Sequence, residues 1–326
     1  MSAPAPPRRF IDWRILPPLA VTAVVLWLLV DRVAGAGALL ETVRGARWSL
    51  LPWAFAFAAA NLGIGCWRWA LIVRAMGHAL PYGRFLWAVL ATWPLALLTP
   101  ARAGDVLRAL AIGDRVPPWE GAGSVVAEKA IDVQSLCVLA MAGTLLHGRP
   151  AWAAVAGGLL AAEWAFLYVL LRHQELLLSR TPLRRFAGKL RALLRAFRAL
   201  LSDRPRAVLA IGSSLVSWGL AAAIVQTFLH ATGAPVPFHT TVGLWPIAVV
   251  AGMLPVTVAG LGTRDAAFVL ALRAATDAAV PEGAVLASTL GYALVGTWLW
   301  ALVGLPFGIR WALRLGAADR RDPDHG

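Results

Sequence analysis

Residues 254–265 read Leu-Pro-Val-Thr-Val-Ala-Gly-Leu-Gly-Thr-Arg-Asp, and they interrupt an apolar region that runs from Val242 to Ala279. A second apolar region, Phe85 to Ile112, is interrupted in the same way by Pro-Ala-Arg-Ala-Gly-Asp at residues 100–105. A membrane-spanning helix needs about 20 consecutive apolar residues, and neither region fits this rule because charge follows Pro and Gly near its middle. We therefore expect two re-entrant segments, each returning to the side of the membrane that it entered.

The composition of the whole chain indicates a membrane protein. Of the 326 residues, 59% are hydrophobic and only 14% are charged, whereas soluble domains carry about 25% charged residues. This composition excludes an ordinary soluble enzyme and predicts an all-α, polytopic membrane protein with a single integral membrane domain over residues 1–326. Six full spans are expected, at Ile15 to Ala34, Leu50 to Val73, Gly121 to Leu146, Ala151 to Leu171, Ala207 to His230 and Val285 to Ile309.

Basic residues indicate how the chain is oriented. The net charge is +13, and residues 172–206 alone hold ten basic and two acidic side chains. Because Lys and Arg concentrate in cytoplasmic loops, this segment and both termini are expected to be cytoplasmic, in a bacterial inner membrane. The basic excess therefore reports topology, and no nucleic-acid partner is expected. Within 172–206, apolar residues recur every three or four positions, which predicts a basic amphipathic connector drawn to anionic lipids; a solvated connector helix is the alternative.

The two interrupted segments would enter the membrane from opposite sides. Each lies between two full spans, so residues 50–146 and 207–309 form two units of an inverted repeat. Paired Pro/Gly-interrupted segments in the two halves of a transporter mark a binding site near the membrane midplane. Kinked hairpins without repeat symmetry are the alternative, because membrane helices often contain Pro and Gly.

The first interruption carries charges at membrane depth. Arg102, Asp105 and Arg108 follow Pro100 at spacings of three and would share one face of a half-helix, where Gly104 permits a close approach. Free N–H groups at the start of that half-helix can hold an anion beside the two guanidinium groups.

The second interruption has a similar composition. Gly260 and Gly262 follow Pro255 and flank a turn, and Arg264 and Asp265 open the next half-helix. Adjacent helical residues do not face each other, so cross-pairing is expected between the interruptions: Asp105 with Arg264, and Arg102 or Arg108 with Asp265. Such pairs are either purely structural or leave at least one Arg to contact a phosphate-bearing headgroup.

A third group of charges lies inside the expected span Gly121 to Leu146. Glu128 and Asp132 are four residues apart and share a face with each other, and Lys129 precedes Asp132 by three. We expect these acids to neutralise the Arg residues of the first interruption; relaying a proton or coupling transport to an ion is the alternative. Arg68, within Trp67-Arg68-Trp69, is interpreted as a snorkelling interface anchor.

Motifs of catalysis do not occur in the sequence. It has no Walker A motif, no zinc-ligand spacing and no G-x-S-x-G elbow. No cofactor, no metal and no enzymatic activity are therefore expected. Cys66 and Cys137 lie in separate apolar runs and are interpreted as small packing residues.

Three motifs in order resemble one family. Pro-Ala-Arg-Ala-Gly-Asp-Val-Leu-Arg (100–108), Glu-Lys-Ala-Ile-Asp (128–132) and residues 254–265 are similar to the P-x-R-x-G-E-x-x-R, E-R-x-x-D and P-x-x-x-G-G-x-G-x-R-E patterns of the lysylphosphatidylglycerol synthase transmembrane-region family, also called flippase-like domain proteins. The chain keeps Pro100, Arg102, Gly104, Arg108, Glu128, Asp132, Pro255, Gly260, Gly262 and Arg264. It departs with Asp105 and Asp265 for Glu, Lys129 for Arg and Ala259 for Gly.

This resemblance implies a membrane region that moves a lipid between leaflets. In bifunctional members a separate soluble domain makes the lipid; that domain is not expected here, so the synthase activity is not transferred. Arg102, Arg108 and Arg264 would hold an anionic or zwitterionic headgroup, Asp105 and Asp265 would orient these arginines, and Glu128, Lys129 and Asp132 would balance charge or couple transport. Two other functions stay open: a non-transporting scaffold for a lipid-modifying enzyme partner, and an intramembrane transferase on a polyprenyl-phosphate with Asp105 or Asp132 as base.

Overall fold

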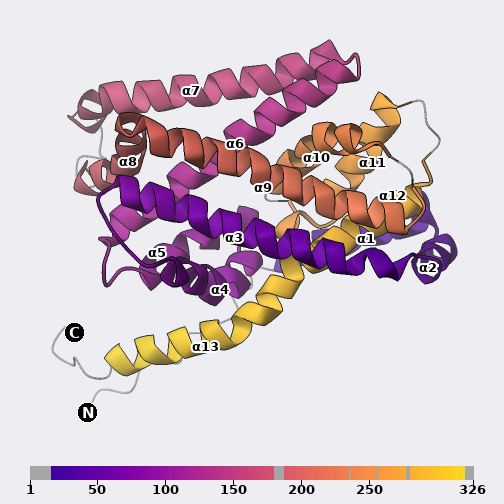
Figure 1. Cartoon of the computed structure of the whole chain (residues 1–326), viewed down its shortest axis with the longest axis horizontal. Helices are drawn as coiled ribbons and strands as arrows, with labels where there is room; N and C mark the ends of the chain where they lie inside the picture. Colours follow the sequence, from indigo (N-terminus) through magenta and orange to yellow (C-terminus); the bar gives the residue numbers. More distant parts are fainter. Residues whose placement is uncertain (1–15, 180–186, 235, 255, 277–279, 320–326) are drawn as a thin grey trace.

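The computed structural model describes residues 16–179, 187–234, 236–254, 256–276 and 280–319, and all regular structure in these ranges is helical, without a strand (Figure 1). The expected all-α class is therefore confirmed. Pro255, one of the expected turn residues, lies outside the described residues. In chain order the helices are α1 (Leu16–Leu28), α2 (Ala36–Arg44), α3 (Leu51–Ala75), α4 (Tyr82–Leu98), α5 (Arg108–Ala111), α6 (Pro118–Leu146), α7 (Pro150–Ser179), α8 (Ala187–Ser202), α9 (Arg204–Ala231), α10 (Phe238–Met253), α11 (Thr263–Ala275), α12 (Glu282–Ala293) and α13 (Leu299–Asp319).

Short helical turns connect several of these helices. Two are π-helical turns: η7 (Leu294–Trp298) joins α12 to α13, whereas η2 (Leu29–Ala34) extends α1 and ends at Gly35, after which the chain bends into α2. The 3₁₀ turns are η3 (Trp48–Leu50), η4 (Pro100–Leu107) and η6 (Val258–Gly260). Turns η4 and η6 lie in the two expected interruptions.

Four helical segments of the described chain are long and apolar enough to cross a membrane. They are Trp48–Ala75, Pro150–Glu175, Arg204–Ala231 and Glu282–Arg314. A bent pair, Leu19–Arg32 with Ala36–Arg44, adds a fifth if it counts as one span. Helix α6 has 29 residues but is not among these segments; it is largely buried by other helices and contains Glu128, Lys129 and Asp132. The expected count of six spans is therefore not confirmed.

Both interruptions are breaks between short helices. Helix α4 has 17 residues and contains Pro94, and α10 has 16 residues and contains Pro246. After each break the chain turns back: η4 packs against α4, and α11 packs against α10. Turns η4 and η6 also contact each other. The two interruptions, more than 150 residues apart in sequence, therefore meet inside the molecule.

Helices α3, α6 and α9 pack on one another. Helix α3 runs beside α9, and α6 contacts α3, α7, α8, α9 and α10 (Figure 1). Helix α7 packs chiefly against α6 and leaves large apolar side chains such as Val155, Phe166 and Tyr168 about two-thirds exposed. An exposed apolar surface of this extent suits contact with lipid.

Helix α8 lies within the basic connector. Its apolar face packs against α6, with Leu194 and Leu200 buried. At the closest approach of the two helices, a Cβ on Gly123 would overlap the backbone of Leu193. The apolar face of α8 is thus docked on protein, where α6 presents the small residue Gly123. Attraction of the basic residues of α8 to anionic lipids stays a prediction.

Candidate functional site

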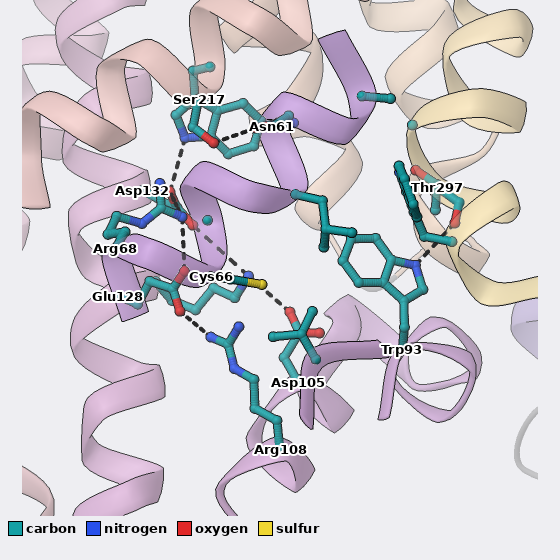
Figure 2. Close-up of a pocket in the computed structure, with 18 of the residues that line it drawn as sticks. Asn61, Cys66, Arg68, Trp93, Asp105, Arg108, Glu128, Asp132, Ser217 and Thr297 are labelled. Carbon is teal, nitrogen blue, oxygen red and sulfur yellow. Dashed lines mark hydrogen bonds and ion pairs between the residues drawn. The ribbon is translucent and has the colours of Figure 1, made fainter. Parts of the chain in front are cut away.

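A cavity of about 150 Å³ lies where α3, α4, α6 and α9 meet the η4 and η7 turns (Figure 2). Its lining joins two kinds of side chain. The charged ones are Arg68, Asp105, Arg108, Glu128, Lys129 and Asp132, and the aromatic ones are Trp93, Trp218, Tyr292 and Trp300.

Arg68 connects α3 to α6. Its side chain is 6% exposed, and its Nη2 atom lies 3.0 Å from Oε1 of Glu128 and 3.0 Å from Oδ1 of Asp132. Sequence analysis interpreted Arg68 as an interface anchor, and this interpretation is wrong. The turn of α3 that carries Arg68 faces α6, where two carboxylates compensate the cost of burying the guanidinium group.

Arg108 and Glu128 form a second buried contact in the same cluster. A guanidinium nitrogen of Arg108 donates to Oε2 of Glu128, so the two oxygens of this carboxylate bind two different arginines. The guanidinium of Arg108 also lies over the ring of Trp69, 4.6 Å from its centroid, in a cation–π contact.

Lys129 is the most exposed cation of the cluster. Its side chain is 46% exposed, and its Nζ lies 2.9 Å from Oδ2 of Asp105 and 4.0 Å from Oδ2 of Asp132. The other oxygen of Asp132 accepts hydrogen bonds from Ser214 Oγ at 2.9 Å and Trp218 Nε1 at 3.2 Å. Lys129 therefore links α6 to the η4 turn through Asp105, and solvent or a ligand can reach its side chain.

The cluster is formally neutral, with three cations and three carboxylates, yet it has unused donors. Arg68 Nε, Arg68 Nη1 and Arg108 Nε are buried and make no hydrogen bond within the described part of the chain. An unpaired buried N–H is costly, and guanidinium groups are well suited to phosphate. The arrangement can therefore accept an anionic group that enters the cavity.

Arg264 and Asp265 lie close to this cavity but do not line it. Arg264 Nη2 is 3.2 Å from Oδ1 of Asp265, and the other carboxylate oxygen accepts from the backbone N–H of Gly262 at 2.8 Å. Arg264 also lies over the ring of Tyr292, 5.0 Å from its centroid, and Tyr292 lines the cavity. Arg264 itself does not line it, so one aromatic ring separates this arginine from the cavity.

The expected cross-pairing between the interruptions is therefore wrong for the described residues. Asp105 pairs with Lys129, Arg108 with Glu128, and Arg264 with its neighbour Asp265. The neighbours meet because Asp265 turns back over the start of α11 to cap Gly262, which brings its second oxygen to Arg264. Arg102 lies in η4, and its side chain is outside the described part.

The turn residues serve close packing and backbone geometry. Pro100 begins η4, and Gly104 donates its N–H to Thr99 Oγ1 at 2.7 Å. A Cβ on Gly104 would lie 2.9 Å from Ala96 Cα, which is too close for a larger residue. Gly260 and Gly262 have φ values of 72° and 86°, which glycine adopts without strain.

Residues 15–304 match the family described as the lysylphosphatidylglycerol synthase TM region. The chain belongs to this family. None of the curated proteins compared with the chain matches it. Membership, together with the spanning helices, makes this a membrane protein of a family linked to lipid metabolism or transport.

Two residues that depart from the lysylphosphatidylglycerol synthase TM-region pattern, Ala259 and Lys129, lie in the η6 turn and in the charged cavity. Ala259, where the pattern has glycine, is the only described non-glycine residue with positive φ, at 54°. Lys129, where the pattern has arginine, is the exposed cation of the cavity.

A Trp-Pro dipeptide that occurs twice in this lysylphosphatidylglycerol synthase TM-region protein was not used in the sequence analysis. The dipeptide Trp-Pro occurs at 93–94 in α4 and again at 245–246 in α10. Trp93 donates its Nε1–H to the Thr297 carbonyl of η7 at 3.0 Å, and Trp245 packs edge-on against Phe268 of α11 at 5.2 Å. Each Trp-Pro dipeptide lies inside the helix that precedes a break.

Proposed function

We propose that the protein binds a phosphate-bearing lipid headgroup in the cavity of Figure 2 and assists transfer of that lipid between the leaflets. One observation carries this proposal. Buried cations with unused donors line a cavity inside the helix bundle, beside the place where the two broken helices meet. Charged groups at membrane depth usually face a pathway, a cavity or a partner. The side chains of this cluster face a cavity and also pair with one another.

The phosphate binds to Lys129 and Arg108 in this proposal. Lys129 is accessible, and its pair with Asp105 opens when a phosphate oxygen replaces the carboxylate. Arg108 keeps Glu128 and offers its free Nε. Arg68 stays bound to the acids of α6, which hold the site in shape. An amine-bearing headgroup meets the released Asp105 carboxylate, so zwitterionic as well as anionic lipids fit the charge balance.

Repeat symmetry supports a transport role. We propose that residues 50–146 and 207–309 are inverted repeats with re-entrant segments at their breaks. Under this symmetry α3 corresponds to α9, α4 to α10, and α6 to the α12–α13 helix. The packing follows it: α6 crosses α10, and α13 crosses α4.

Both of these crossings use glycine. Gly143 of α6 lies so close to Gly243 of α10 that a Cβ on either would overlap the other backbone. Gly304 of α13 approaches the carbonyl of Leu90 in α4 in the same manner. Close contacts of this kind in both halves support the proposed inverted repeat, in which the two breaks lie near the centre.

Orientation in the inner membrane follows the basic residues. The basic face of α8 marks the cytoplasmic side in this proposal, because Lys and Arg accumulate there. Both termini then lie in the cytoplasm.

Leaflet exchange in reconstituted vesicles tests the function. The purified protein is placed in vesicles that carry a fluorescent phospholipid, and an impermeant quencher reports how fast lipid from the inner leaflet becomes accessible. Faster exchange than in protein-free vesicles is expected. No acceleration, together with a stoichiometric enzyme partner, would favour the scaffold function. A new product formed from a polyprenyl-phosphate in detergent would favour the transferase, with Asp105 or Asp132 as the base.

A further inference from the structure

A second, apolar groove lies on the other side of α6 from the charged cavity. It has a volume of about 370 Å³ and is lined by α6, α7, α8 and α9. Its α6 wall is formed by Ala127, Ala130, Ile131 and Gln134, whereas Glu128 and Asp132 of the same helix line the charged cavity. The groove is therefore a site distinct from the one described above.

The two long walls of the groove belong to helices that have the length and composition of membrane spans, α7 and α9. Trp164, Leu167 and Leu171 line it from α7, and Ile211 lines it from α9. Water does not fill apolar space of this kind stably. A hydrocarbon chain does, because it gives every wall atom a contact and leaves no polar group unpaired.

The groove is basic at one end. Arg172 lies at the α8 end of the α7 wall, and the wall from Trp164 to Arg172 extends about 12 Å at 1.5 Å per residue. Arg204 opens α9 three residues before Ala207, which also lines the groove. Within the described ranges neither arginine takes part in an ion pair, whereas Arg191, Arg195 and Arg206 do. Arg172 therefore lies in the groove, and Arg204 lies within three residues of it, as cations without an ion-pair partner among the described residues.

We propose that this groove binds one anionic diacyl phospholipid from the leaflet on the α8 side, with an acyl chain between α7 and α9 and the phosphate on Arg172. The groove matches a lipid in polarity along its whole length: cationic where the headgroup region begins and apolar toward the interior. Basic pockets between membrane helices bind anionic headgroups in this way. The bound lipid fills the space between α7 and the rest of the bundle and fixes α7, which otherwise rests chiefly on α6.

Native mass spectrometry of the protein in mild detergent tests this site with phosphatidylglycerol and phosphatidylcholine as probes. The Lys129→Gln background weakens lipid binding in the other cavity, so that a further loss of bound lipid on changing Arg172 or Ala207 reports the groove. In this background Arg172→Gln is expected to weaken phosphatidylglycerol binding about tenfold, which corresponds to one charge-assisted hydrogen bond. Ala207→Phe, which fills the groove, is expected to abolish it. Arg310→Gln, at an exposed arginine of α13 outside the groove, serves as the matched control and is expected to bind like the background protein.

A second readout covers the case in which Ala207→Phe does not fold. Phosphatidylglycerol is expected to raise the unfolding temperature of the background protein and of Arg310→Gln, but not of Arg172→Gln. Equal binding of phosphatidylglycerol by all variants would overturn the proposal, as would binding of phosphatidylcholine as tight as that of phosphatidylglycerol. Neither result bears on leaflet exchange, since that function is assigned to the charged cavity.

Discussion

Arg68 Nη2 lies 3.0 Å from Glu128 Oε1, although 60 residues separate the two in sequence. The other oxygen of Glu128 binds Arg108, so one carboxylate ties α3 to the helix that follows the first break. Both Arg68 and Glu128 are almost fully buried. Their contact fixes the shape of the cavity. Lys129 is the cation of the cluster that a ligand can reach most easily.

Replacement of Arg68 by Ala is expected to destabilise the fold severely. Removal of one partner of a buried ion pair leaves an uncompensated charge and costs about 3–5 kcal/mol. Here Glu128 and Asp132 both lose a partner. Thermal unfolding in detergent measures the effect, with Arg310→Ala as an exposed control that should change stability by less than about 0.5 kcal/mol. An Arg68→Ala protein as stable as this control would refute the role given to Arg68.

Gly143→Ala is expected to cost roughly 1–3 kcal/mol, because the added methyl group overlaps the backbone of Gly243 and forces α6 and α10 apart. Gly158 provides the matched control, since it lies in α7 and a Cβ added to it would meet no atom within 4 Å. Gly158→Ala should be neutral or stabilising by up to about 1 kcal/mol through helix propensity. Unfolding temperatures of the two variants decide the matter; equal values would show that α6 and α10 do not pack closely.

Ala259→Gly is expected to be neutral or to stabilise the protein by up to about 1 kcal/mol. Alanine at φ 54° bears the strain of the left-handed region, which costs about 1–2 kcal/mol, and glycine removes this strain at some cost in unfolded-state entropy. Ala259→Val should have the opposite effect, since a β-branched residue at positive φ is more strained. A glycine variant clearly less stable than the valine variant would contradict the backbone geometry of η6.

Sequence alone predicted the elements whose signal is local. The all-helical class followed from apolar length, although the count of six spans was not confirmed. Pro and Gly identified both breaks, because these residues act on their own backbone. Gly260 and Gly262 are at the turn for the reason that their sequence context indicated.

One pairing across the bundle was predicted from the sequence, since Glu128 neutralises Arg108 of the first interruption as expected. The other partners across the bundle were beyond the reach of the sequence. Arg68 follows a tryptophan at the end of an apolar run, a pattern that an interface anchor shares, and only the packing of α3 on α6 shows which role it has. Arg264 and Asp265 meet through a cap that turns one side chain back, which spacing rules for the middle of a helix do not describe. Pairing of charges depends on which helix faces meet, and that is set by the whole fold.

Leaflet exchange by Lys129 variants tests the central claim most directly. Lys129 is half exposed, so Lys129→Gln is expected to fold normally and to retain the buried pairs of Arg68 and Arg108. The account predicts at least about tenfold slower exchange for Lys129→Gln, the loss of one charge-assisted contact to the phosphate, and near-normal exchange for Lys129→Arg, which keeps the charge. Exchange by folded Lys129→Gln at the wild-type rate would contradict the claim that this cavity carries the lipid headgroup.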